Sequence, residues 1–277
     1  MMIKKERLDK LLVDMGLTDS REKAKRYIMA NLVKVNGIII NKAGTRCNIE
    51  SKINIEKDNY PFVSRGGFKL KKALTEFEVD VNGKIVIDVG ASTGGFTDCL
   101  LKYGAEEVYC VDVGYGQLDW ALRQDDRVTN LEKTNIRYLQ KNRFNFLFDL
   151  ATVDVSFISL EKVLPVLAEL LKDNGEVIAL VKPQFEAGRV LVKKGGIVDD
   201  PEVHKEVISK LLEKIKNQFH LLNMTFSPIK NSPGNIEYFL YLEKKIGKDN
   251  LSDANINLLK KIVDEAHHYF FAKETHV

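Results

Sequence analysis

The sequence predicts an α/β protein in two parts, a small α+β domain followed by a larger, doubly wound domain with a mainly parallel sheet. Short helical patterns and β-branched segments fill residues 6–55, whereas strands alternate with helices from residue 80 onward. A glycine-rich turn follows the first strand of the second part. We expect the small domain over residues 1–58, a linker over 59–64 and the larger domain over 65–277.

The composition excludes several classes of protein. The uncharged apolar runs, such as residues 177–181, are far shorter than the roughly 20 residues that a membrane-spanning helix needs. The basic start, MMIKKERLDK, is not followed by the apolar stretch of a signal peptide. Three scattered cysteines suit a reducing compartment better than a disulfide framework. We therefore expect a cytoplasmic protein.

The charge is unevenly distributed. The whole chain carries a net charge of +3, but residues 1–72 hold 17 Lys and Arg against 8 Asp and Glu. A basic first quarter on a mildly acidic remainder favours a nucleic-acid-binding module. A well-solvated small domain is the alternative that charge alone leaves open.

The small domain is expected to contain two helices and a hairpin. Apolar residues recur at helical spacing over residues 6–16, and a second helix is expected from residue 19 or 20 to about residue 30. Asn36 and Gly37 form a turn signal between β-branched residues, which predicts a hairpin over 34–40. Ile53 and Ile55 are expected to complete the small sheet.

This pattern resembles the S4 domain, an RNA-binding module. The resemblance is carried by R-L-D-K-L-L, S-R-E-K-A-K-R-Y-I and V-K-V-N-G within residues 5–56. It implies that a set of basic side chains faces an RNA backbone; these are Arg7, Arg21, Lys25, Arg26 and Lys34, to which we add Arg65 at the domain junction. For any single one of them, an ordinary solvent-facing charge is an equally good interpretation.

The larger domain is expected to contain four buried parallel strands, at 84–89, 108–113, 146–154 and 177–182. Helices are expected at 96–103, 160–171 and 204–217. Residues 237–243 alternate in polarity, which predicts an antiparallel last strand at the edge of the sheet, and 251–271 are typical of a terminal helix.

The most informative local motif is Asp88-Val-Gly90-Ala-Ser92-Thr-Gly94-Gly95-Phe96-Thr97. Glycines at a strand-to-helix turn let the backbone approach a ligand, and Asp112, after the next strand, can bind the ribose hydroxyls of a nucleoside cofactor. A nicotinamide cofactor competes with S-adenosylmethionine at this point, and so does a structural turn without a cofactor. Ser92 replaces the second glycine of the dinucleotide fingerprint. The pattern D-x-G-x-x-x-G-G therefore looks more like motif I of S-adenosylmethionine-dependent methyltransferases.

The chemistry of the methyl acceptor can be narrowed. Enzymes that methylate exocyclic amines typically carry Asn/Asp-Pro-Pro-Tyr, but this chain has Asp154-Val-Ser-Phe157. Methylation of pyrimidine C5 needs a cysteine nucleophile, and we expect Cys99 and Cys110 to be buried in a helix and a strand. Of the acceptor chemistries considered, methylation of an oxygen is therefore the one that remains.

Four residues are placed where such a site would need them: Lys69, Asp154, Lys182 and Glu237. Ligands bind beyond the carboxyl ends of parallel strands, where Asp154 and Lys182 stand, and an antiparallel last strand brings Glu237 to the same edge. This Lys-Asp-Lys-Glu tetrad resembles that of FtsJ-type ribose 2′-O-methyltransferases. Surface ion pairs are the alternative interpretation for any one of the four.

The whole chain resembles the TlyA family of rRNA 2′-O-methyltransferases, often labelled haemolysin A. The resemblance includes VSRGGFKL, DVGASTGGFTDCLL, VDVGYGQL, TVDVSFISL, VKPQFE and PGNIEYFL. It implies S-adenosylmethionine as cofactor, ribosomal RNA or ribosomal subunits as partner and cytidines as target. The five histidines show no spacing with cysteines or carboxylates that suggests a metal site, and the apolar runs are short, so we expect neither a metal nor a membrane. The resemblance also implies the tetrad as catalytic and a set of cofactor-binding residues, namely Asp88, Gly90, Ala91, Ser92, Gly94, Gly95, Phe96, Thr97, Asp112 and Asn135.

The roles within the tetrad are expectations. Lys182 is the candidate base for the ribose 2′-hydroxyl, although a free lysine, with a pKa of about 10.4, must be tuned for that task. The alternative is that Lys182 stays charged and steers the hydroxyl. Asp154 is expected to orient Lys182, while Lys69 and Glu237 position the ribose. A non-catalytic ribosome-binding factor and a membrane-lytic protein remain as alternative functions.

Overall fold

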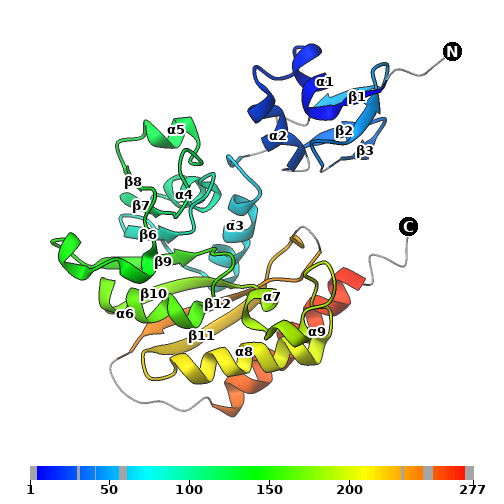
Figure 1. Cartoon of the computed structure of the whole chain (residues 1–277). Coiled ribbons are helices and arrows are strands. Elements are labelled where there is room, and N and C mark those ends of the chain that lie inside the picture. The colour runs from blue at the N-terminus through cyan, green and yellow to red at the C-terminus, as the bar shows by residue number, and fades with distance from the viewer. Residues whose placement is uncertain are drawn as a thin grey trace. The chain divides into compact units, whose positions relative to one another are not determined.

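The computed structural model describes residues 5–29, 32–40, 42–55, 61–231, 234–245 and 252–271. The chain forms two compact units, Met1–Arg65 and Gly66–Val277 (Figure 1). Each unit has a hydrophobic core of its own, so we describe each by itself.

The first unit packs two helices on two small sheets. Its elements are β1 (Lys5–Arg7), α1 (Leu8–Asp14), α2 (Arg21–Met29), β2 (Val33–Val35), β3 (Ile38–Ile39), β4 (Arg46–Asn48) and β5 (Ile53–Ile55). β1 pairs with β4, and β2 lies between β3 and β5. The core is filled by leucines of α1, by an alanine and an isoleucine of α2 and by the two valines of β2.

Two predictions for this unit can be compared with the structure. The hairpin is confirmed: Asn36 and Gly37 have φ values of 51° and 85°, as a tight turn with two left-handed residues requires. The first helix begins later than predicted, at Leu8 instead of residue 6. The reason is that Glu6 and Arg7 extend to pair with β4, a long-range contact that outweighs the local helical spacing.

The second unit is a seven-stranded sheet with helices on both faces (Figure 1). The strand order is β11 (Phe219–Phe226), β12 (Tyr238–Lys244), β10 (Leu171–Val181), β9 (Phe148–Val153), β6 (Ile85–Val89), β7 (Glu107–Val111), β8 (Val128–Leu131). The helices are α3 (Gly66–Phe77), α4 (Gly95–Lys102), α5 (Trp120–Arg123), α6 (Leu164–Leu170), α7 (Pro183–Glu186), α8 (Pro201–Ile215) and α9 (Asp253–Phe271).

The four predicted parallel strands are all present, and the last strand is antiparallel as expected. Its predicted place is wrong, because β12 lies inside the sheet, between β10 and β11. The edge positions belong to β11 and β8, which the periodicity did not identify. β12 is buried on both faces over most of its length. The alternating polarity of its sequence therefore does not mark an exposed edge strand. The predicted helix over 160–171 is divided into a short 3₁₀ turn, Leu160–Lys162, and α6.

Alternate residues of the strands face the two helical layers. Ile87 and Val89 of β6 join a core to which α6, α8 and α9 contribute. Asp88, between them, faces the other layer and accepts a hydrogen bond from Thr97 of α4. The chain leaves β6 toward β7 on one side, and β9 lies on the other side of β6. This reversal creates a crevice at the carboxyl ends of β6 and β9, the usual ligand position in such a sheet.

Candidate active site

The four tetrad side chains converge from four separate elements. Lys69 comes from α3, Asp154 directly follows β9, Lys182 directly follows β10, and Glu237 directly precedes β12. Because β12 runs against the other strands, its first residues reach the edge where β9 and β10 end. The topology thus brings residues up to 168 positions apart to one place.

The distances define a continuous chain of alternating charges. The Nζ of Lys69 donates a hydrogen bond of 2.6 Å to Oε2 of Glu237 and lies 3.8 Å from Oδ2 of Asp154. The other carboxylate oxygen of Asp154 lies 2.5 Å from Nζ of Lys182, which also donates to Oγ of Ser156 at 3.0 Å. Lys69, Lys182 and Glu237 are buried. Two buried ammonium groups therefore share the carboxylate of Asp154.

The electrostatics of Asp154 follow from this arrangement. Burial tends to raise the pKa of its carboxyl group, but the charges of Lys69 and Lys182 lower it by more. The net effect is a pKa below the usual value for aspartate, so Asp154 stays ionised and holds both lysines in place.

A cavity of about 750 Å³ opens beside the tetrad. It is lined by the carboxyl ends of β6, β7 and β9 and by the loops that follow them. Gly90 is required where β6 ends: its φ is +85°, and a Cβ there would lie 2.5 Å from the carbonyl oxygen of Asp154. The amide of Asp154 in turn donates to the carbonyl of Val89. The glycine thus permits the close approach of β6 and β9 that places Asp154 at the cavity.

Asp112 organises the opposite side of the cavity. Its Oδ2 accepts a hydrogen bond from the amide of Ser92 at 2.8 Å, and its Oδ1 accepts one from the amide of Gly114 at 2.7 Å. These bonds fix the carboxylate and the glycine-rich turn relative to each other. Each carboxylate oxygen keeps lone-pair capacity for a second donor, such as a ribose hydroxyl.

The predicted cofactor residues fall into two groups. Gly90, Ser92, Asp112 and Asn135 line the cavity. The remaining six are not among its lining residues: Asp88, Ala91, Gly94, Gly95, Phe96 and Thr97. The sequence motif does not distinguish the positions that line the cavity from those that do not.

The surroundings of Asp88 are those of a residue that supports the fold. Its side chain is fully buried and accepts hydrogen bonds from the hydroxyl groups of Thr97, at 2.6 Å, and Thr152, at 2.9 Å. Burial raises the pKa of Asp88 to about 6, against the opposing effect of these two hydrogen bonds. Through these two hydrogen bonds, Asp88 connects β6 to α4 and to β9 and so supports the strands whose ends line the cavity.

The structure bears out the expectation for the cysteines. Cys99 and Cys110 are both buried, and burial raises the pKa of Cys99 to about 12 and that of Cys110 further still. Thiols in this state are poor nucleophiles, so cysteine-dependent methylation of a base has no support here.

Three residues at the cavity were not singled out from the sequence. Ser156 accepts the hydrogen bond from Lys182. Phe157 is 90% exposed with a φ of +64°, an unusual conformation for an aromatic residue, and its ring lies 4.9 Å from that of Phe185. Strained, exposed residues concentrate at functional sites. The available signal was their position, since all three lie two or three residues after a tetrad residue.

A buried hydrogen-bond network lies behind Glu237. Asn235 accepts from the amide of Val198 at 2.8 Å and donates to the carbonyl of Gly196 at 2.9 Å. The carbonyl of Val198 can only accept, so Nε2 of His204, 2.9 Å away, carries the proton of the ring. These bonds join the segment that carries Glu237 to the loop before α8. The network therefore holds the second half of this loop against the domain.

His204 is neutral in the folded protein near neutral pH. Its Nδ1 lies 2.8 Å from the hydroxyl of Tyr238 and 3.0 Å from Nε2 of His267, so the unprotonated Nδ1 can accept a hydrogen bond from a neighbouring side chain. Burial is the main cause that lowers the pKa of His204 to about 4, and His267 adds to the effect. Asp199 and Asp200 act weakly in the opposite direction.

We therefore expect His204 to make stability depend on pH. The unfolded chain binds a proton at this group below about pH 6.5, whereas the folded chain resists it until about pH 4. The stability advantage of wild type over His204→Gln should be fully present above pH 6.5. It should fall by about 3 kcal/mol as the pH decreases to 4. Chemical unfolding of both proteins across this range measures the difference, and a difference that does not change with pH contradicts the assignment.

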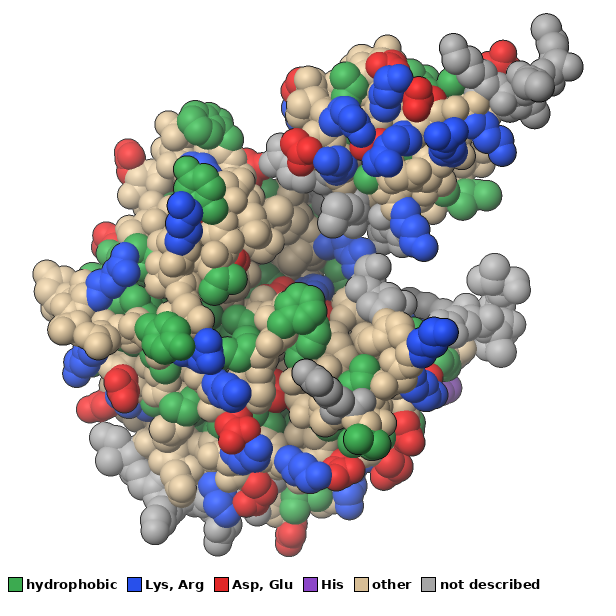
Figure 2. All heavy atoms as spheres, in the orientation of Figure 1, with side chains coloured by type: hydrophobic (Ala, Val, Ile, Leu, Met, Phe, Trp, Pro, Cys, Tyr) green, Lys and Arg blue, Asp and Glu red, His purple; other side chains and the backbone are tan. Residues whose placement is uncertain are grey.

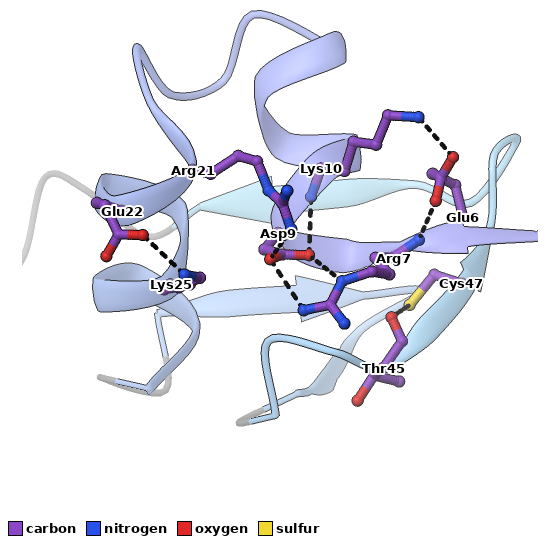
Figure 3. Close-up of polar contacts among 9 residues, drawn as sticks. All are labelled: Glu6, Arg7, Asp9, Lys10, Arg21, Glu22, Lys25, Thr45 and Cys47. Atoms are coloured by element: carbon purple, nitrogen blue, oxygen red, sulfur yellow. Dashed lines mark hydrogen bonds and ion pairs between the residues drawn. The ribbon is translucent and has the colours of Figure 1, made fainter.

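The predicted RNA-facing side chains lie mostly on the first unit, whose visible face carries a row of Lys and Arg (Figure 2). Arg7 and Arg21 both bind the carboxylate of Asp9, as Figure 3 shows. Lys25 lies 2.7 Å from Glu22. Lys34, in β2, and Arg65, the last residue of the unit, are half-buried, and the side chain of Arg26 lies outside the described residues.

Neither a membrane-spanning helix nor a group of three potential metal ligands is found among the residues that the structure describes.

Comparison with known proteins identifies both units. The FtsJ-like methyltransferase family matches residues 62–244, and the S4 domain matches residues 6–53. YqxC of Bacillus subtilis, which carries a provisional rRNA methyltransferase name, is 47% identical, and the match covers 96% of each chain. The 16S/23S rRNA (cytidine-2′-O)-methyltransferase TlyA of Mycobacterium tuberculosis is 39% identical over 91% of this chain and 97% of its own.

A solved structure from Streptococcus thermophilus, provisionally named a haemolysin, has a TM-score of 0.79 and 44% identity. The match covers 99% of this chain and 100% of that one. The fold, the two family matches and the relatives agree. The chain belongs to the TlyA family and is a methyltransferase with an S4 domain and an FtsJ-like catalytic domain.

Proposed function

We propose that this enzyme transfers a methyl group from S-adenosylmethionine to the ribose 2′-hydroxyl of cytidines in 16S rRNA, 23S rRNA or both. The observation that carries the proposal is the tetrad, in which Lys182 contacts Asp154, a residue that lines the same cavity as Asp112. An rRNA substrate agrees with the cytoplasmic location expected from the sequence.

The residues at the cavity fit this cofactor. The volume of about 750 Å³ lies within the range of sites for molecules of this size. The carboxylate of Asp112 suits the two hydroxyls of the cofactor ribose, and Asn135, which lines the same cavity, would contact its adenine end. The cavity extends to Asp154 and Ser156, so a methionine moiety would lie near the tetrad.

The chain's own residues supply the acceptor side of the reaction. When bound, the cofactor contributes an electrophilic methyl group on a sulfonium. Lys182 takes or directs the proton of the ribose hydroxyl, and Asp154 fixes the direction of its Nζ through an ion pair of 2.5 Å. The buried Lys69–Glu237 pair presents one donor and one acceptor to the ribose. Placement of this kind supplies a large part of the rate in a direct transfer between two bound molecules.

The choice of RNA rests on other observations. The S4 domain and its basic side chains favour an RNA substrate, and buried Cys99 and Cys110 disfavour methylation at pyrimidine C5. Cytidine as the target is inferred from the name of the Mycobacterium tuberculosis relative, a 16S/23S rRNA (cytidine-2′-O)-methyltransferase.

Replacing Asp112 tests the cofactor site. We expect Asp112→Ala to weaken S-adenosylmethionine binding by about tenfold to a hundredfold, because it removes charge-assisted hydrogen bonds and the anchor of the Ser92 turn. Asp126→Ala removes an exposed carboxylate from the loop before β8 and serves as the matched control. Calorimetric titration measures both variants, and equal affinity for wild type and Asp112→Ala contradicts the assignment.

Transfer of labelled methyl groups tests the function itself. Purified 30S subunits, 50S subunits and free rRNA are incubated with S-adenosylmethionine and wild-type enzyme. Incorporation into at least one substrate is the expected result. Cofactor binding without incorporation into any of them points instead to a binding factor or a different RNA.

A further inference from the structure

The N-terminal unit contains a buried carboxylate that binds two exposed arginine side chains. The side chain of Asp9 has no exposed area, whereas the side chains of Arg7 and Arg21 are 45% and 52% exposed. Asp9 lies in the first turn of α1, and Arg21 is the first residue of α2. One buried carboxylate thus binds two exposed guanidinium groups from neighbouring elements (Figure 3).

The geometry at Arg7 is bidentate. Its Nε donates to Oδ1 of Asp9 at 3.0 Å, and its Nη2 donates to Oδ2 at 3.1 Å. Two parallel hydrogen bonds fix both the position and the plane of a guanidinium group. Arg21 donates from Nη2 to the same Oδ2 at 2.8 Å. The carboxylate therefore fixes two guanidinium groups side by side.

Asp9 remains ionised under all ordinary conditions. The hydrogen bonds from Arg7, and next those from Arg21, lower the pKa of Asp9 to about 2, against the opposing effect of burial. Asp9 takes two of the five N–H groups of Arg7 and one of those of Arg21, which leaves donors on both for an external acceptor.

We propose that Asp9 is a positioning residue for RNA: it holds Arg7 and Arg21 as a preformed pair that binds adjacent phosphates of the rRNA substrate. The inference rests on the proposed function and adds to it the group that orders the RNA-binding side chains. Free arginine side chains lose rotamer freedom on binding, and arginines already fixed in the free protein avoid that loss.

The direction in which Asp9→Asn changes RNA affinity distinguishes a positioning role from a purely electrostatic one. Asp9→Asn removes a negative charge from a surface that binds a polyanion, so charge alone predicts tighter RNA binding. Loss of positioning predicts weaker binding. Glu22→Gln is the matched control, because it makes the same change in charge at an exposed carboxylate that pairs with Lys25 on the same unit.

The experiment measures methyl transfer and RNA binding by the full-length enzyme at one fixed salt concentration. For Asp9→Asn we expect the KM for rRNA and the Kd for rRNA to rise about tenfold, with kcat within about twofold of wild type. The affinity for S-adenosylmethionine should not change, since its cavity lies in the other unit. Glu22→Gln should bind RNA as tightly as wild type or more tightly.

Introducing Asp9→Asn into an enzyme that lacks both arginines distinguishes a positioning role of Asp9 from a general structural role. In the Arg7→Gln/Arg21→Gln enzyme, adding Asp9→Asn should cause no further loss of RNA binding, because the groups that it positions are gone. A further loss of similar size, through unfolding of the unit or by any other route, overturns the inference. Unchanged or tighter binding by Asp9→Asn overturns it too. Absence of RNA binding by the wild-type enzyme contradicts the proposed function instead.

Discussion

Replacing Lys182 by alanine is expected to lower methyl transfer by about a thousandfold or more while S-adenosylmethionine still binds. The change removes the group that takes or directs the hydroxyl proton, and such groups contribute roughly 10²–10⁴-fold to rates. It also leaves Asp154 with one lysine in place of two. Single-turnover measurements with saturating rRNA and cofactor give the size of the loss.

Two variants refine this result. Lys172→Ala makes the same substitution near the opposite end of the same strand, where Lys172 forms an exposed ion pair with Asp149, and it should retain activity. Lys182→Arg keeps the positive charge but cannot act as a base at neutral pH. Near-normal turnover of Lys182→Arg excludes an obligatory proton acceptor and assigns steering, whereas a loss as large as that of alanine supports the base.

Gly90→Ala is expected to reduce activity by at least about a hundredfold, because displacements of about 1 Å at a reacting site have that effect. The added Cβ would lie 2.5 Å from the carbonyl oxygen of Asp154. The ends of β6 and β9 must then separate, which moves the carboxylate of Asp154 away from Lys69 and Lys182. Both cofactor affinity and kcat should decrease, as measured by calorimetry and single turnover.

Gly83→Ala provides the control for backbone strain. Gly83 has a φ of +68°, close to that of Gly90, but nothing lies within 4 Å of the added Cβ. It should lose some stability, about 1–2 kcal/mol, and keep its activity. Equal activity losses in the two variants contradict the close-approach argument and leave strain alone as the cause.

Three members of the tetrad were accessible from the sequence because they stand at strand ends, whereas Lys69, within α3, was indicated by the family resemblance of its motif VSRGGFKL. Asp154 and Lys182 follow hydrophobic runs that are recognisable as buried strands, and parallel topology then sends both to one edge. Glu237 required the further prediction that the last strand is antiparallel, which is correct. The place of that strand within the sheet was not predictable, since it depends on pairing with β11, a segment without a clear period.

The sequence did not show whether an individual side chain points into the core or into the cavity. Asp88 and Asp112 both stand at strand ends with similar local signals, yet one is buried against Thr97 and the other lines the cavity. Likewise, the sequence marks Arg7 and Arg21 as basic positions but does not indicate that Asp9 joins them. Both distinctions arise from packing between elements that are distant in sequence.

The position of the transferred methyl group tests the central claim most directly. After reaction of the wild-type enzyme with ribosomal subunits, the rRNA is digested to nucleosides and analysed by mass spectrometry, with alkaline hydrolysis in parallel. We predict 2′-O-methylcytidine and a linkage resistant to alkali, both absent with Lys182→Ala. A methyl group on a base, with alkali-sensitive linkages throughout, would contradict the assignment of the tetrad to ribose methylation.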